Sequence, residues 1–332
     1  MELHTKIHEL AHSLGLTMHV AAANVNFSQS KFTHWLAQGN HGDMNWLAKH
    51  SDLRAHPRAI FPHTQSILVF SLPYAQNIPE RRGKIALYAL GRDYHKILKK
   101  KLAHIVTYIK HNGENAISFV DTAPIMEKPI ASTCGAGWIG KSSLTISEEY
   151  GALLFLGEIF TSLPIPPTKP HTSDKCGLCS QCIQACPTQA ILPNRTIDAR
   201  KCISYLTIEH KGSIPVEYRK LIHDHLYGCD TCSTACIYNP KNKIPIDPDF
   251  APRIYPDVRD ILFLTKKTFT AIFAGSAIHR IGLIQLQRNA CIVLGNIGTQ
   301  DDISALEHIQ TTSTSLILHE HAQWGIDMIR ER

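Results

Sequence analysis

The sequence CGLCSQCIQACP at residues 176–187, followed by CDTCSTAC at residues 229–236, decides the fold of the middle of this chain. The first block has the spacing C-x-x-C-x-x-C-x-x-x-C-P, which is typical of bacterial ferredoxin cluster sites. A loop with two residues between cysteines wraps one corner of an iron–sulfur cube, so three thiolates reach three irons. The fourth cysteine of the block, followed by proline, ligates the neighbouring cube. The block therefore predicts two four-iron clusters.

Eight of the ten cysteines supply the ligands of these two clusters. The first cluster is expected to use Cys176, Cys179, Cys182 and the distant Cys236. The second cluster takes the remaining set, in which Cys202 is the only nearby candidate for the last position: Cys186, Cys202, Cys229 and Cys232. Zinc and disulfides are the alternatives. Zinc ribbons prefer two separate C-x-x-C pairs, which a continuous run of four cysteines fits poorly.

The composition is that of an ordinary globular protein. The chain has 332 residues, of which 44% are hydrophobic and 19% charged, enough for two or three structural units. Thiolate clusters fit a reducing cytoplasm, and no apolar run approaches the roughly 20 residues that span a bilayer. A net charge of +6 permits an RNA partner without establishing one. We expect Cys134 and Cys291, which the clusters do not use, to be buried apolar residues.

Helices and strands alternate over residues 1–165, which predicts an α/β (α+β) domain. Apolar residues at helical spacing predict helices, and apolar runs bounded by turn residues predict buried strands. The expected helices are 3–14 and 93–113, the expected strands are 18–25, 66–75, 115–121 and 152–160, and residues 53–62 are expected to form a proline-broken loop.

Two proline-rich segments, 162–170 and 241–258, divide the rest of the chain. They give three predicted domains: 1–165, a ferredoxin-like two-cluster module at 166–245, and a helical tail at 246–332. In the tail, helices at 283–298, 301–310 and 315–329 are similar to a HEAT-type helix pair with a cap. A plain helical packing domain is the alternative.

Residues 135–142, GAGWIGKS, match the phosphate-binding pattern G-x-x-x-x-G-K-S. That motif needs a buried strand before it and a helix after it, because phosphate sits on a helix N-terminus. Here no convincing strand precedes the glycines, and a strand follows them. We therefore interpret the glycines as allowing close approach of the backbone to a large planar ligand.

The sequence resembles the epoxyqueuosine reductase family over most of its length. The matching landmarks are GRDYHK (91–96), VDTAPIMEKPIA (120–131), GAGWIGKSSLTIS (135–147), LGEIF (156–160), the cysteine block, ARKCISYLTIEHKG (199–212) and LYGCDTCSTAC (226–236). The resemblance implies a corrinoid-reductase-like N-terminal domain, cobalamin and two 4Fe-4S clusters. It implies reduction of the epoxide of epoxyqueuosine at the wobble position of tRNA, giving queuosine. The expected partners are the tRNA anticodon stem-loop and an external electron donor, with the chain as a cytoplasmic monomer.

The resemblance also implies site residues. Asp121 matches the family's catalytic acid, a role for which its pKa would have to be raised toward neutrality, with Glu127 as the second candidate. The matching cofactor-binding positions are Arg54, Asp121, Thr145, Leu156, Ser204 and Asp230. Asp93 and Tyr94 are candidates for the substrate side, although Asp93 also fits a helix cap.

A basic belt near the cysteines is the candidate tRNA surface: Arg200, Lys201, Lys211, Arg219 and Lys220, with Tyr205 and Tyr218 for stacking. The first alternative function is a corrinoid iron–sulfur reductase of a small molecule, similar to a reductive dehalogenase, which would need no such belt. A plain electron carrier and a nucleotide hydrolase that uses Lys141 are the others.

Overall fold

The computed structural model describes residues 3–25, 29–77, 80–170, 174–240 and 247–332. The N-terminal half is built on a four-stranded sheet in the order β1-β2-β7-β4. These strands are β1 (Thr17–Ala22), β2 (Ser66–Pro73), β7 (Leu154–Thr161) and β4 (Ala116–Phe119). All three neighbouring pairs are antiparallel. The expected alternation of helices and strands is present, but an antiparallel sheet makes the fold α+β and not α/β.

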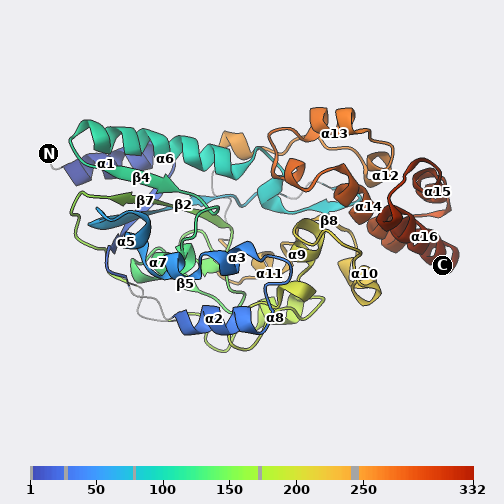
Figure 1. The fold of residues 1–332 in the computed structure, drawn as a ribbon, viewed down its shortest axis with the longest axis horizontal. Helices are drawn as coiled ribbons and strands as arrows, with labels where there is room; N and C mark the ends of the chain where they lie inside the picture. Colours follow the sequence, from blue (N-terminus) through green and yellow to red (C-terminus); the bar gives the residue numbers. More distant parts are fainter. Residues whose placement is uncertain (1–2, 26–28, 78–79, 171–173, 241–246) are drawn as a thin grey trace.

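Helices cover both faces of this sheet, as Figure 1 shows. Helices α1 (Leu3–Ser13) and α6 (Tyr94–His111) lie on one face and α7 (Glu127–Thr133) on the other. Every residue of β2 is buried, because its alternate side chains pack into two different cores. The sequence indicated this with its unbroken apolar run.

The segment predicted as a loop at 53–62 is instead largely helical. It contains α4 (Ser51–Ala55) and α5 (Pro57–Ile60), which follow α2 (Gln29–Ala37) and α3 (Trp46–Lys49). Pro57 does not break a helix here, because it occupies the first position of α5, where a missing N–H costs no hydrogen bond.

One short strand pair, β3 (Lys84–Ile85) with β8 (His225–Tyr227), ties the cysteine-rich region to the N-terminal half, and a hairpin of the N-terminal half packs against Cys176. β3 pairs in parallel with β8, and β5 (Trp138–Ile139) forms the hairpin with β6 (Thr145–Ile146). The remaining elements of this region and its entry are η1 (Leu87–Ala89), α8 (Gln181–Ala185), η2 (Ala199–Lys201), α9 (Ile203–Ile208), α10 (Val216–Ile222) and α11 (Thr231–Thr234). Segments far apart in the sequence thus interleave around the cysteines.

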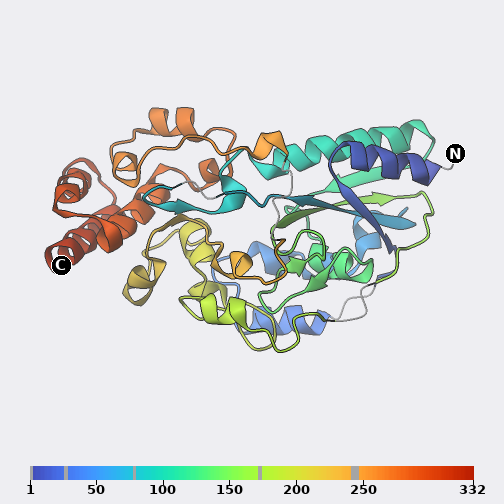
Figure 2. The ribbon, with the colours of Figure 1, turned by 180° about the vertical axis from the view of Figure 1, so that it is seen from behind.

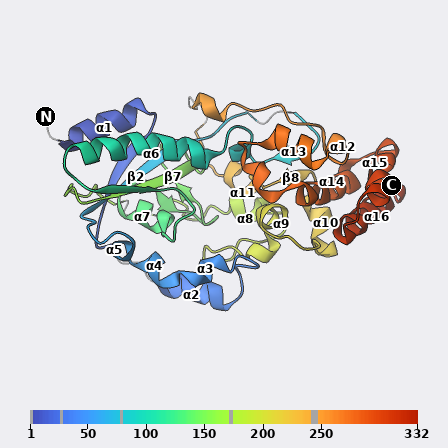
Figure 3. The ribbon, with the colours of Figure 1, turned by 45° about the horizontal axis from the view of Figure 1, so that its top comes forward.

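The C-terminal tail is helical, and Figures 2 and 3 show it at the opposite end of the molecule from α1. Its long helices α14 (Leu283–Ile297), α15 (Ile303–Thr312) and α16 (Leu316–Arg330) agree with the predicted ones. They are preceded and joined by η3 (Pro248–Phe250), α12 (Val258–Ile261), α13 (Lys266–Phe273), η4 (Ala277–Ile281) and η5 (Gln300–Asp302). Within the described residues, no helix combines the length and apolar character needed to cross a membrane.

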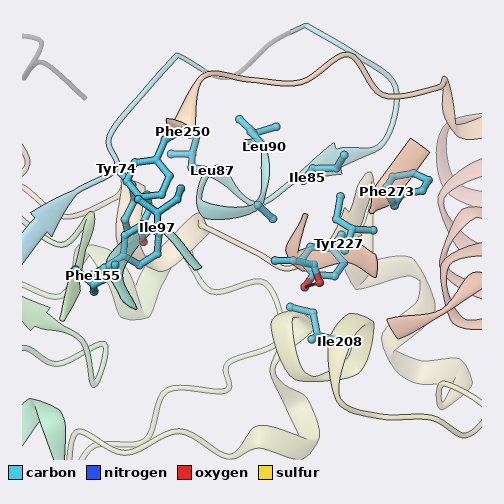
Figure 4. Close-up of a cluster of buried hydrophobic side chains, with 14 of the residues drawn as sticks. Tyr74, Ile85, Leu87, Leu90, Ile97, Phe155, Ile208, Tyr227, Phe250 and Phe273 are labelled. Carbon is cyan, nitrogen blue, oxygen red and sulfur yellow. Dashed lines mark hydrogen bonds between the residues drawn. The ribbon is translucent and has the colours of Figure 1, made fainter. Parts of the chain in front are cut away.

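One hydrophobic core runs from the sheet into the tail. Figure 4 shows Tyr74, Phe155 and Phe250 at one end of it and Tyr227 and Phe273 at the other. A buried polar joint adds to this core. The guanidinium of Arg288, on α14, donates to the carbonyl oxygens of Leu206, His210 and Gly212 at 2.7–2.8 Å. The tail therefore fixes the turn that follows α9.

We predict that Leu102→Ala lowers the free energy of unfolding by about 2–5 kcal/mol, because Leu102 is fully buried between α6 and the sheet and its removal leaves a cavity. Lys99→Ala on the exposed face of the same helix is the matched control and should change it by less than about 0.5 kcal/mol. Urea denaturation followed by circular dichroism measures both. Equal effects of the two substitutions would contradict the packing described here.

Candidate functional site

Asp121 follows β4 by two residues and has a left-handed backbone conformation, with φ of 55°. Aspartate tolerates this conformation better than most residues, but it still has to be held in place. The backbone N–H of Asp121 donates to Oε1 of Glu127 at 2.5 Å. The turn directs the Asp121 carboxylate toward the start of α6, and 56% of the side chain remains exposed.

The start of α6 binds this carboxylate. The hydroxyl of Tyr94 donates to Asp121 Oδ2 at 2.6 Å, and Nε2 of His95 lies 3.1 Å from the same oxygen. The other ring nitrogen of His95, Nδ1, lies 2.8 Å from Oδ1 of Asp93, which also caps the helix. Both ring nitrogens therefore face carboxylate oxygens, an arrangement that favours the charged imidazolium.

The pKa values follow from this geometry. Burial alone would raise the pKa of Asp121, but the hydrogen bonds from His95 and Tyr94 outweigh it and hold the pKa below its usual value. The expectation of a raised pKa is therefore wrong for Asp121. Burial likewise opposes the charged form of His95, but its hydrogen bonds to Asp121 and Asp93 prevail and raise its pKa to about 9.

A second, buried pair of carboxyl groups lies behind Asp121. Glu158, on β7, is 0% exposed, and neither of its carboxyl oxygens has a hydrogen-bond partner among the described residues. Burial and the nearby Glu127 raise the pKa of Glu158 well above its usual value. Burial and the charge of Asp121 raise the pKa of Glu127 to about 7. Glu127, the second candidate acid, is thus placed to hold the Asp121 turn.

Two of the predicted cofactor-binding residues, Arg54 and Thr145, have buried polar atoms that could bind a ligand. Arg54, on α4, is close enough to Glu127 and Asp121 for their charges to favour its guanidinium, although burial lowers its pKa overall. Nε of Arg54 and Oγ1 of Thr145 are buried and have no partner among the described residues. Two polar atoms left in this state suit a ligand rich in amide or phosphate groups, because unpaired buried polar atoms are costly.

The other predicted cofactor positions lie toward the cysteines or in the core. Leu156 is half-buried on β7 beside the α7 core. Ser204 is half-buried on α9. The carboxyl of Asp230 accepts a hydrogen bond from the Leu87 N–H at 2.5 Å, and burial raises its pKa to about 6.

All ten cysteines are free thiols, which excludes the disulfide alternative. Four of them line one cavity, together with Lys141 and Tyr238: Cys176, Cys179, Cys182 and Cys236. The indole N–H of Trp138 donates to Sγ of Cys176 at 3.4 Å, the kind of contact that tunes a cluster's potential.

The remaining predicted ligands form a second set: Cys186, Cys202, Cys229 and Cys232. Burial raises the pKa of Cys232, and the charges of the other three thiols raise it further, so the four lie near one another. Among the described residues, no three His, Cys, Asp or Glu side chains are arranged to hold a single metal ion. The continuous C-x-x-C-x-x-C-x-x-x-C spacing suits a polynuclear cluster better than zinc.

The second set is electrostatically linked to the Asp121 site. The charges of Cys232 and Asp121 both act on Lys128. Cys182 of the first set also acts on Cys232. Cys232 therefore lies within electrostatic reach of both the first set and Lys128.

Lys141, the lysine of the phosphate-binding pattern, stabilises the first cysteine loop. Its ammonium donates to the carbonyl oxygens of Gly177 and Cys179 at 2.7 and 2.8 Å, inside the first cysteine loop. The first glycine of the motif, Gly135, follows α7 and not a strand, and Lys141 is followed by strand β6 and not by a helix. The decision against a phosphate-binding loop is consistent with this placement.

The basic belt is only partly available at the surface. Arg219 is 2% exposed and ion-paired with Glu320, and Tyr205 is 7% exposed and hydrogen-bonded to Asp43. Lys211 and Lys220 are exposed. The buried positions of Arg219 and Tyr205 correct the expectation that they face RNA, because both are used to fasten the module.

Sequence reasoning missed two residues of the site. His95 lies within the landmark GRDYHK, and its spacing two residues after a helix-capping Asp93 was a usable signal. Glu158 was also missed, although a glutamate inside an apolar strand marks a buried ionisable group.

Two family models match the chain. Residues 54–122 match "Epoxyqueuosine reductase QueG, DUF1730", and residues 175–239 match "4Fe-4S double cluster binding domain". The second range contains all eight predicted ligand cysteines.

Curated relatives and solved structures agree with these models. Epoxyqueuosine reductase of Escherichia coli is 37% identical over 94% of this chain and 86% of its own length; that of Aliivibrio fischeri is 39% identical over 98% and 91%. The structure of epoxyqueuosine reductase from Streptococcus thermophilus has a TM-score of 0.88 at 30% identity, covering 100% of this chain and 91% of that one. A crystal structure of epoxyqueuosine reductase with an epoxyqueuosine-modified tRNA-Tyr stem loop has a TM-score of 0.89 at 27% identity, covering 98% and 90%. This chain therefore belongs to the epoxyqueuosine reductase family of oxidoreductases.

Proposed function

We propose that this chain reduces the epoxide of epoxyqueuosine at the wobble position of tRNA to give queuosine. The observation that carries the proposal is the exposed Asp121 carboxylate, which Tyr94 and His95 hold and whose charge acts on the same lysine, Lys128, as that of Cys232. Relatives of that name, one of them solved with an epoxyqueuosine-modified stem loop, support the substrate.

We assign the two thiol sets to two 4Fe-4S clusters, one held by Cys176, Cys179, Cys182 and Cys236 and the other by Cys186, Cys202, Cys229 and Cys232. The double-cluster family model and the cavity among the first four thiols support this assignment. An external donor delivers electrons to the first cluster, and the second cluster passes them toward the acid site.

The residues around Asp121 fit cobalamin, which the family resemblance implies. The unpartnered Nε of Arg54 and Oγ1 of Thr145 would hold its polar periphery, and Leu156, Ser204 and Asp230 would contact it between the sheet and the second cluster. When bound, cobalamin supplies a low-potential centre that transfers electrons to carbon. The chain's own part is to bind and orient the substrate and to deliver protons.

Asp121 is the residue that we assign to proton delivery. Converting an epoxide to an alkene and water takes two electrons and two protons, and the departing oxygen has to be protonated as its bond to carbon breaks. Asp121 has an exposed carboxyl oriented by two hydrogen bonds, so it is the catalytic acid in this proposal.

A cleft between α3, the turn after α9 and the start of α14 suits the tRNA loop. Its walls come from α3, from the turn after α9 and from η4 and the start of α14: Asp43, Trp46, Ile208, Glu209, Lys211, Gly212, Arg280, Ile281 and Gln285. Trp46 is 48% exposed, and the Arg288 joint fixes the turn that carries Lys211. An exposed indole beside cationic side chains suits stacking of an unpaired base with phosphate contact.

The remaining features of the proposal are the three-part division at 1–165, 166–245 and 246–332, a HEAT-like character of the tail, a monomeric state and action on tRNA in the cytoplasm. The packing of α14, α15 and α16 against one another supports the tail assignment.

We predict that Asp121→Asn lowers the rate of queuosine formation by at least about 100-fold, because an amide cannot supply the proton. Nucleoside mass spectrometry of the reacted stem-loop measures the product. Asp52→Asn, an exposed acid on α4, is the control and should keep the wild-type rate. An Asp121→Asn enzyme with wild-type turnover would rule out the catalytic assignment.

Loss of one ligand should remove one cluster. We predict that Cys202→Ala, purified anaerobically, retains about half of the wild-type iron, since only the second thiol set is broken. Cys134→Ala, a buried cysteine outside both sets, should retain all of it. The iron content per chain measures the effect of both substitutions. An iron content of Cys202→Ala equal to that of wild type would show that Cys202 is not a ligand.

Trp46→Ala and Lys211→Ala should each weaken binding of the modified stem-loop several-fold. For Lys211→Ala the slope of log affinity against log salt should also fall by about 0.7–0.9, the value for one lost phosphate contact. Lys99→Ala, on the far side of α6, is the control. Fluorescence anisotropy at several salt concentrations measures affinity, and unchanged binding in both variants would place the RNA elsewhere.

A further inference from the structure

Asp121 cannot be its own source of protons. Its pKa lies below the usual range because the hydrogen bonds from His95 and Tyr94 outweigh the effect of burial, so the carboxyl is ionised at neutral pH. Each turnover nevertheless consumes two protons. The carboxylate therefore has to take up a proton before it can act, either from solvent at its exposed face or from a side chain that contacts it.

The contacts around Asp121 narrow the choice of that group. Glu127 accepts a hydrogen bond from the backbone N–H of Asp121 and does not touch its carboxylate in any described contact. The ammonium of Lys128 donates to the carbonyl of Ser143. Tyr94 does contact the carboxylate, but burial raises the pKa of its phenol far above neutrality, which makes it a poor donor.

His95 has both the contact and the proton. Its Nε2 lies 3.1 Å from Asp121 Oδ2, and its Nδ1 lies 2.8 Å from Asp93 Oδ1. The ring stacks on Tyr94 at 4.0 Å between centroids, which fixes its plane. About 23% of the side chain is exposed, so solvent can reload it.

We propose that His95 is a positioning residue that loads Asp121 with the proton delivered to the epoxide oxygen. This inference rests on the proposed function. The proton moves from His95 Nε2 through Asp121 Oδ2 to the epoxide oxygen in the same step in which the bond from that oxygen to carbon breaks, so the basic alkoxide that forms draws the proton across. The electron pair comes from the reduced cofactor. Solvent reprotonates Nε2 of the imidazole while its Nδ1–H stays hydrogen-bonded to Asp93. A second proton then follows the same route, the oxygen leaves as water, and the alkene forms.

The charged groups around this relay set its pH range. On α6 and its cap, His95 meets Asp93 and Tyr94; from the turn after β4 it meets Asp121. Glu127, Lys128 and Arg54 face Asp121 from α7 and α4. Because the two carboxylates outweigh burial and raise the pKa of His95 to about 9, the imidazolium persists below that pH and is lost above it. Turnover should therefore hold to about pH 9 and then fall.

The test is the single-turnover rate of queuosine formation by the holoenzyme on modified stem-loop between pH 6 and 10. In His95→Gln the rate should fall about tenfold per pH unit through neutrality, because Asp121 then has to take its proton from solvent. In Asp93→Asn the alkaline limb should move to lower pH, because the charge that helps hold the proton on His95 is gone. Asparagine caps helices as well as aspartate, so α6 should be preserved.

Tyr94→Phe is the matched control. It removes the other hydrogen bond to the same carboxylate oxygen but leaves His95 in place, so its rate should keep the wild-type pH dependence. Imidazole nitrogen NMR of the same proteins gives a readout independent of turnover. One histidine signal, missing in His95→Gln, should titrate near pH 9 in wild type and lower in Asp93→Asn.

The possible outcomes distinguish a failure of the proposed function from a failure of the His95 relay alone. A wild-type enzyme that makes no queuosine overturns the proposed function. An active wild type whose alkaline limb and histidine signal are unchanged in Asp93→Asn overturns the relay alone. If His95→Gln fails to retain its clusters, seen by visible absorption, the Asp93→Asn shift still decides.

Discussion

One strained turn, at Asp121, is the constraint on which the site depends. Its left-handed backbone places a carboxylate at the end of the sheet, and Glu127 holds the turn through the backbone N–H. Tyr94 and His95 then bind the carboxylate from the first turn of α6. Three consecutive elements, α6, β4 and α7, therefore converge on one side chain whose other face stays open. This arrangement suits a reaction in which Asp121 delivers protons from one side of the substrate while electrons arrive from another.

The thiols of the cysteine module are linked to the same site through Lys128. Cys232 of the second set acts electrostatically on Lys128, as Asp121 does, and in our proposal electrons approach from the cysteine module while protons enter from α6. This layout requires the module to be rigidly attached. The β3–β8 pairing, the Lys141 ammonium in the first cysteine loop and the buried Arg288 joint each provide part of that attachment. The same joint fixes the wall of the cleft that we assign to tRNA.

Much of this could be predicted from the sequence, and the failures have identifiable causes. Cysteine spacing predicted a double-cluster module, which the family model over residues 175–239 supports, because cluster geometry constrains short loops directly. The division of the eight cysteines into two sets of four stays a prediction. Apolar periodicity predicted β2, α6 and the tail helices because burial is periodic along an element. Strand direction was beyond reach, since pairing partners such as β2 and β7 are far apart in the sequence. The lowered pKa of Asp121 was also beyond reach, because it results from His95 and Tyr94 on another element. Short helices around Pro57 were missed because proline was interpreted only as a breaker.

The central claim is that eight thiolates, sorted into two sets, hold two iron–sulfur cubes that serve the Asp121 site. The most direct measurement is the iron and acid-labile sulfide content of the anaerobically purified protein, combined with electron paramagnetic resonance after reduction. The account predicts about eight irons and eight sulfides per chain and signals from two cubane clusters. A protein with a single cluster, with zinc in place of iron, or with no reducible iron would contradict it.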